Sequence, residues 1–98
     1  MIVRLTPAAK QDLRETLRWY RHGKSGLDLE FKRSLEACLA GVRRTPKAYL
    51  SVHRDVRRAL LHRFPYAVFF VLKSDSIVVI ACLHGARDPG TWMRRRSQ

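Results

Sequence analysis

Apolar residues in the first half of the chain recur at the spacing of amphipathic helices. One stripe predicts a helix from residue 7 to about residue 21; it consists of Ala9, Leu13, Leu17 and Tyr20. Thr6 suits the N-cap of this helix, because Pro7 then takes the first helical position, where its missing N–H costs nothing. Before this helix, residues 2–5 predict a short strand.

A second stripe at helical spacing predicts a helix from about residue 27 to residue 43. It consists of Leu27, Phe31, Leu35, Cys38, Leu39 and Val42. The Gly-rich residues 22–26 separate the two helices, with Ser25 as the expected cap of the second, and Thr45-Pro46 ends it. Helices joined by so short a break are expected to form an antiparallel hairpin.

The second half changes to the pattern of β-strands. Apolar or alternating runs at residues 56–62, 66–72 and 77–83 predict three neighbouring antiparallel strands, with residues 47–55 as an irregular connector. The last run is apolar throughout, so it is expected to be a central strand covered on both faces. The order β-α-α-β-β-β predicts an α+β fold in one domain, residues 1–98, with a helical hairpin packed on a small antiparallel sheet.

The charge balance narrows the class of partner. Twenty Lys and Arg against eight Asp and Glu give a net charge of +12, and the isoelectric point is about 11.1. Such an excess favours an acidic protein partner or a nucleic acid. Part of it lies in the segment 93–98, which is expected to be a solvated basic tail.

Little in the composition favours a cofactor, a metal or a membrane. Cys38 and Cys82 fall on predicted apolar faces and are expected to be buried free thiols in a reducing cytoplasm. No clustered His and Cys spacing predicts a metal site, and we expect no cofactor. The N-terminal segment lacks the apolar core of a signal peptide, so we expect neither export nor a membrane span.

Several motifs in this order resemble those of the RelE/ParE superfamily of bacterial toxins from type II toxin–antitoxin pairs. They are the Thr-Pro-Ala-Ala helix start at residues 6–9, an Arg-rich strand, Pro65-Tyr66 entering an aromatic strand, and a buried strand ending in His84-x-x-Arg87-Asp88. The likeness extends from residue 3 to about residue 92. It implies the same sheet-and-hairpin fold and an acidic, ParD-like antitoxin as partner.

The resemblance implies one of two mechanisms. ParE-like members poison DNA gyrase, which blocks replication, and have no accepted active site; the ending at residues 84–88 resembles this branch. RelE-like members cut messenger RNA on the ribosome with a cluster of basic residues. That pattern matches poorly, since Leu60 and Ala67 occupy positions where those enzymes carry Lys or Arg. We therefore expect a gyrase-directed toxin that stabilises its plasmid by inhibiting growth and has no active site of its own.

Candidate contacts follow from this expectation. The target-binding set comprises Arg58, Arg63, His84, Arg87, Trp92, Arg94 and Arg95. The antitoxin-binding set comprises Arg14, Leu17, Arg18, Tyr20, Arg21, Arg57 and Arg58. If the chain is instead a messenger-RNA endonuclease, the catalytic set is Arg58, His84 and Arg87, because cleavage of a phosphodiester requires a proton donor or acceptor and cations.

Several of these residues have a structural alternative. His84 at a strand end is also typical of a hydrogen-bonded structural residue, and Trp92 suits either the edge of the core or stacking on a partner. We expect Asp88 to form an internal ion pair with the tail, and the role of Arg87 stays open. A plain nucleic-acid-binding module is a further hypothesis, although no helix-turn-helix or RNA-recognition signature supports it.

Overall fold

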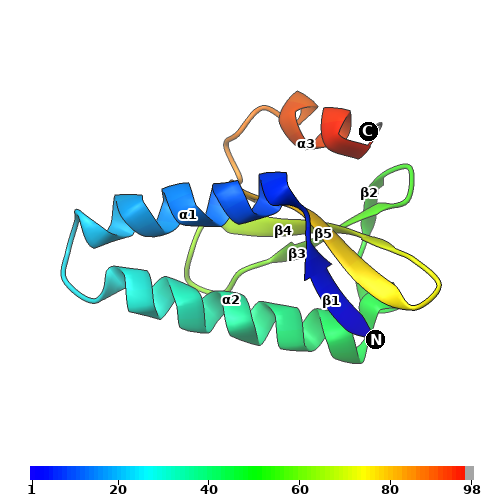
Figure 1. Cartoon of the computed structure of the whole chain (residues 1–98), viewed down its shortest axis with the longest axis horizontal. Helices are drawn as coiled ribbons and strands as arrows, with labels where there is room; N and C mark the ends of the chain where they lie inside the picture. The colour runs from blue at the N-terminus through cyan, green and yellow to red at the C-terminus, as the bar shows by residue number, and fades with distance from the viewer. Residues whose placement is uncertain (97–98) are drawn as a thin grey trace.

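The chain folds into a five-stranded sheet with helices on both faces (Figure 1). The structure is a computed structural model, and it describes residues 1–96. The elements in chain order are β1 (Ile2–Leu5), α1 (Pro7–Arg21), α2 (Leu27–Arg44), the 3-10 helix η1 (Pro46–Ala48), β2 (Ser51–His53), β3 (Val56–Leu60), β4 (Tyr66–Leu72), β5 (Ser76–His84) and α3 (Gly90–Arg96).

The sheet is mixed, with the strand order β1-β5-β4-β3-β2. Strands β2 to β5 pair antiparallel as a meander, whereas β1 runs parallel to β5 from the pair Ile2–Ser76 to the pair Leu5–Val79. The α+β class is thus confirmed, but the purely antiparallel sheet is corrected. A parallel pair needs a long crossover, and the helical hairpin carries the chain away from β1 before the meander begins.

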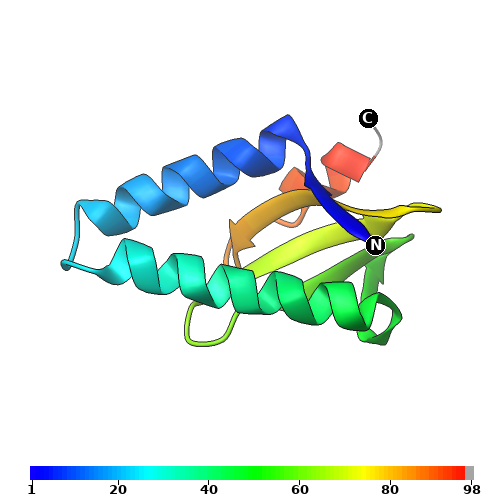
Figure 2. The ribbon, with the colours of Figure 1, turned by 60° about the horizontal axis from the view of Figure 1, so that its bottom comes forward.

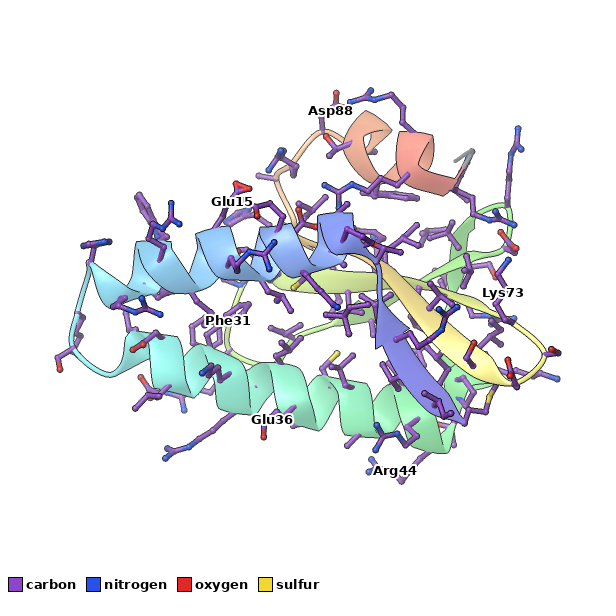
Figure 3. All side chains as sticks on the ribbon, in the orientation of Figure 1. Glu15, Phe31, Glu36, Arg44, Lys73 and Asp88 are labelled. Atoms are coloured by element: carbon purple, nitrogen blue, oxygen red, sulfur yellow. The ribbon has the colours of Figure 1, made fainter. Side chains whose placement is uncertain are left out.

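The main core lies between the helical hairpin and one face of the sheet (Figure 2). Phe31 of α2 and Phe70 of β4 are both fully buried there, and each contributes roughly 1.5–3 kcal/mol through removal from water. Phe31 lies between α1 and α2, whereas Glu36, five residues on, points away from the body (Figure 3). The helical stripe read from the sequence is therefore the buried face.

The opposite face of the sheet is covered by α3, which was not expected. Trp92 is 6% exposed, and its ring stacks on Phe69 of β4 with 4.5 Å between centroids. Residues 93–96 of the expected solvated tail belong to this helix, and residues 97–98 lie outside the described residues. Because α3 adds cover on the second face, β5 is buried from Ser76 to Leu83, as expected for a central strand.

The element boundaries depart from expectation at three places. The connector contains β2 and η1, so it is not wholly irregular. The strand expected at residues 56–62 ends at Leu60, before a turn in which Arg63 has the left-handed φ of 73°. Gly26, with φ 88°, forms the N-cap of α2 without a side-chain bond, because the chain enters the helix through a conformation that glycine tolerates and Ser25 does not supply the cap.

Candidate functional site

The outer edge of β5 is only partly covered by β1. Their pairing ends at Leu5–Val79, where Thr6 accepts the N–H of Ala9 at 3.1 Å and starts α1, while β5 continues to His84. Beyond that point the edge faces α1 rather than another strand. The expected N-cap at Thr6 is confirmed. Because β1 ends there, the outer edge of β5 has no neighbouring strand beyond Val79 within residues 1–96.

Two side chains from opposite ends of the chain cover the first part of this open edge. Asp12 of α1 accepts the N–H of Cys82 at 3.0 Å, and Arg95 of α3 donates to the carbonyl of Ile80 at 3.0 Å. The two side chains also bind each other, with Arg95 Nη1 2.6 Å from Asp12 Oδ2. The pair therefore replaces the strand that would otherwise satisfy these backbone groups.

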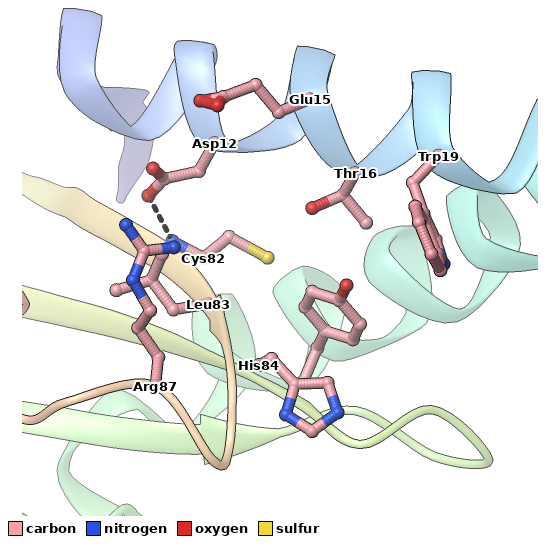
Figure 4. Close-up of a pocket in the computed structure, with 9 residues that line it drawn as sticks. Asp12, Glu15, Thr16, Trp19, Cys82, Leu83, His84 and Arg87 are labelled. Atoms are coloured by element: carbon pink, nitrogen blue, oxygen red, sulfur yellow. Dashed lines mark hydrogen bonds between the residues drawn. The ribbon is translucent and has the colours of Figure 1, made fainter.

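A groove follows this pair, between α1 and the end of β5 (Figure 4). Its volume is about 240 Å³, and the lining residues are Asp12, Glu15, Thr16, Trp19, Tyr66, Cys82, Leu83, His84 and Arg87. Residues of α1 form one wall, and the last residues of β5 with the following turn form the other. Hydrogen-bond donors and acceptors thus meet an exposed aromatic ring in one hollow.

The ring of His84 has a defined orientation in this groove. Its Nδ1 accepts the N–H of Ala86 at 2.9 Å, so the neutral ring carries its proton on Nε2. The ring also meets Tyr66 edge to face, with 5.3 Å between centroids. His84 is therefore hydrogen-bonded as a structural residue, which was one of the two alternatives from the sequence. Its side chain also lines the groove.

Trp19 is a groove residue that the sequence did not single out. It is 72% exposed, and besides this groove it borders two further hollows near the tip of the helical hairpin. The available signal was its position outside the apolar stripe of α1: a large aromatic residue there has no place in the core. Trp is enriched among the residues that carry binding energy at protein interfaces.

The three residues of the expected catalytic set do not converge. Arg58 lies opposite Phe69 in the β3–β4 register, and Phe69 packs against Trp92 on the α3 face. His84 lies opposite Tyr66, whose ring packs in the core beneath the helical hairpin. Since directly opposed residues share a face of the sheet, Arg58 and His84 point to opposite faces.

The other expected target contacts divide into exposed and internal residues. Arg87 and Arg94 are exposed, and Arg63 lies 4.0 Å from Glu30 on the surface. Trp92 is buried in the core, which favours the first of its two alternatives, packing at the core edge, over stacking on a partner. Arg95 is held in the ion pair with Asp12, so the structure corrects its expected position on a free tail.

The expected antitoxin contacts divide in the same way. Arg14, Arg18 and Arg21 are exposed along α1, with Arg21 also 3.8 Å from Asp28. Leu17 and Tyr20 are half-buried and pack on the main core, and this burial raises the pKa of Tyr20.

Arg57 and Asp88 form contacts that differ from those expected. Arg57 donates to the backbone carbonyls of Lys47 and Tyr49, at 3.2 and 2.7 Å, so it anchors the connector to β3. Asp88 accepts the N–H of Gly90 at 3.0 Å at the start of α3. The expected ion pair of Asp88 with the tail is absent from residues 1–96, where its carboxylate instead accepts the N–H of the first residue of α3.

Both cysteines are free thiols, as expected. Burial raises the pKa of Cys38 to about 11 and that of Cys82 to about 12. Within residues 1–96 no group of three potential ligands is placed to hold a metal ion. Nor does this part of the chain contain a helix both long and apolar enough to cross a bilayer.

Comparisons with known proteins agree with this architecture. A search among curated protein sequences gives no match. A solved structure described as a chromosomal ParDE toxin–antitoxin system from P. aeruginosa is similar, with a TM-score of 0.69 and 19% identity over 86% of this chain and 95% of that chain. At that identity the likeness shows the fold. The sequence model of the ParE toxins of type II toxin–antitoxin systems, parDE, matches residues 3–89. The chain therefore belongs to the ParE toxin family.

Proposed function

We propose that this ParE-type toxin acts by binding DNA gyrase and stabilising its complex with cleaved DNA, so that replication stops. The observation that carries this proposal is the separation of Arg58 from His84 on opposite faces of the sheet. Cleavage of a phosphodiester requires a proton-transfer group and cations around one phosphate. Inhibition by contact requires only a complementary surface, so we infer that the chain is not itself an enzyme.

The proposed gyrase contacts are the exposed members of the expected set. They are Arg58, Arg63, His84, Arg87 and Arg94. The net charge of +12 supports a partner that is acidic or that carries DNA. The toxin would act in the cytoplasm, where gyrase works, and would support plasmid stabilisation by inhibiting growth.

We also propose that a ParD-like, acidic antitoxin neutralises the toxin. The similar structure from P. aeruginosa is described as a ParDE system, which supports a partner of this type. Arg14, Arg18 and Arg21 form a basic stripe along the exposed side of α1. A disordered acidic segment that folds along this stripe would cover it and gain charge-assisted contacts.

A pair of assays tests the gyrase proposal. Purified toxin is added to a gyrase supercoiling reaction and, separately, to a translating extract. Linearised plasmid with intact messenger RNA is expected, and Arg58→Glu should reduce the linear product while the matched variant Arg43→Glu, on the surface of α2, should not. Truncated messenger RNA with intact plasmid would instead establish the ribosome-dependent endonuclease. Inertness in both assays would refute the gyrase proposal.

A further inference from the structure

Two backbone groups on the open edge of β5 have no protein partner in residues 1–96. The N–H of Cys82 points away from β4, because it bonds Asp12. The carbonyl of Cys82 and the N–H of His84 point the same way, since backbone groups alternate between the two sides of an antiparallel strand. In agreement, the carbonyl of Tyr66, opposite His84, is used by Leu61 on the other side of β4. Both free groups face the groove beside α1.

Two other backbone groups on this edge are already hydrogen-bonded, and they determine whether an added strand would run parallel or antiparallel to β5. An antiparallel strand would exchange two bonds with a single residue of β5, using both its N–H and its carbonyl. Cys82 cannot offer both, because Asp12 holds its N–H; His84 cannot either, because its carbonyl accepts the N–H of Arg87 at 2.9 Å. A parallel strand instead bonds the carbonyl of Cys82 and the N–H of His84 through one of its own residues. An antiparallel strand could reach the same two groups only by turning one carbonyl and one N–H of its own toward groups that are already occupied, so the parallel direction is favoured.

A parallel segment in this place would continue the line of β1. The chain leaves that line at Thr6, where α1 begins, and the pair of Asp12 and Arg95 closes the gap next to it. The groove starts directly beyond this pair. Its outer wall is α1, with Thr16 and the exposed ring of Trp19. A strand lying between a sheet edge and a helix is an established mode of peptide recognition.

The charges of the groove and of the whole toxin indicate that the bound peptide is acidic. Arg87 lines the groove, is exposed and forms no ion pair within the described residues, while the molecule as a whole carries a charge of +12. Glu15 is a carboxylate at the α1 side of the groove. A carboxylate of the peptide would therefore lie toward Arg87 and away from Glu15.

We propose that the groove between α1 and β5 binds an extended acidic segment of a partner protein as a parallel strand, held by the backbone of Cys82 and His84 and by Arg87. This deepens the proposed neutralisation by an acidic antitoxin, whose extended segment is the occupant to which we commit. Trp19 covers one flank of the segment. The site is separate from the basic stripe Arg14, Arg18 and Arg21, so the antitoxin would grip the toxin at two places.

The probe is the peptide acetyl-Glu-Val-Glu-Val-Glu-amide, titrated into the full-length toxin and followed by the backbone amide signals. The amide of His84 is expected to shift and to become protected from exchange. A second peptide of the same charge, N-methylated at every internal amide, lacks the donors that reach Cys82 and should bind about tenfold more weakly. Arg87→Glu and Trp19→Ala should each weaken binding about five- to tenfold, whereas the exposed control Arg43→Glu should not.

Three results would overturn the proposal. They are equal binding of the N-methylated peptide, an unshifted His84 amide, and no binding up to about 1 mM, the weak end of specific recognition. The titration contains neither gyrase nor ribosome. If the peptide does not bind but the toxin still poisons gyrase, only the proposed peptide-binding groove is refuted. If the peptide binds but the toxin does not poison gyrase, only the proposal that gyrase is the target is refuted.

Discussion

Asp12 and Arg95, 83 residues apart, form a two-bonded ion pair that joins the first helix to the last. Arg95 Nη1 lies 2.6 Å from Asp12 Oδ2 and Nη2 lies 3.0 Å from Oδ1. The side chains are 18% and 7% exposed, and each also binds the open edge of β5. The pair thus protects a sheet edge and docks α3 at the same time.

Replacing Arg95 by Ala should destabilise the fold strongly. The change leaves the Asp12 carboxylate buried without its cation and the carbonyl of Ile80 without its donor. Breaking a buried pair by removing one partner costs about 3–5 kcal/mol, and the partial exposure of Arg95 favours the lower end. The measurement is the free energy of unfolding in urea, compared with the exposed neighbour variant Arg94→Ala, which should stay within about 0.5 kcal/mol of the parent. Equal effects of the two variants would contradict an internal role for Arg95.

Replacing Trp92 by Ala should release α3 from the sheet. The ring is buried and stacked on Phe69, and its loss costs about 3–5 kcal/mol in a typical core. Because α3 is short and terminal, part of this loss should appear as local opening rather than global unfolding. Hydrogen exchange is expected to accelerate in residues 90–96 more than in β4. Trp92→Phe, which keeps a ring there, should restore most of the protection.

The parts of the fold that follow from local pattern could be predicted from the sequence. Thr6 and Pro7 mark the start of α1 by capping chemistry, and the apolar run of β5 marks a buried strand. The docking of α3 could not be predicted from local pattern, because three successive arginines in a short segment resemble a solvated tail. Only a contact with Asp12, far away in sequence, shows that one of them is internal.

The candidate groove shows the same division. His84 and Arg87 stood out because they follow a buried strand. Trp19 did not, since the helical stripe of α1 assigns it no partner. The mixed sheet was missed because periodicity identifies strands but not the direction in which β1 pairs with β5. Long-range pairing is settled by packing, which no local pattern records.

The two thiols should be nearly inert in the native protein. The pKa of about 11 at Cys38 lies two units above the ordinary value of 9.0, so its thiolate at pH 8 is about 100-fold scarcer than that of an unperturbed thiol. Cys82, at about 12, should react more slowly still. Labelling with a thiol reagent at pH 8 is expected to be fast in urea and slow without it. The raised pKa values also predict that the contribution of these two thiols to stability does not change below about pH 9. It falls as the pH rises toward 11, because only the unfolded thiols ionise there.

Asp55 provides a pH-dependent contact at the outer end of α3. The guanidinium of Arg96 binds its carboxylate, with Nη2 2.8 Å from Oδ2, and lowers the pKa of Asp55 below its usual value of 3.8. The contribution to stability is therefore present above pH 3.8 and is lost as the pH falls through the lower native pKa. Titration by NMR should show the pKa of Asp55 rising toward 3.8 in Arg96→Ala but not in Arg94→Ala. A pKa unmoved in both variants would mean that Arg96 is not the cause.

Reversing the charge of Arg14 and Arg18 should weaken the complex with the acidic antitoxin. Both side chains are exposed on α1, and the guanidinium of Arg14 also donates to the side-chain oxygen of Gln11 at 3.0 Å. The double variant Arg14→Glu/Arg18→Glu lowers the net charge from +12 to +8, since each reversal removes two units. The affinity should fall about tenfold or more at low salt, mainly through slower association, and should depend less on salt concentration. The control Arg43→Glu/Arg44→Glu makes the same change of net charge at the end of α2 and separates a specific contact from long-range attraction. If both double variants weaken binding equally, the basic stripe is not the docking surface.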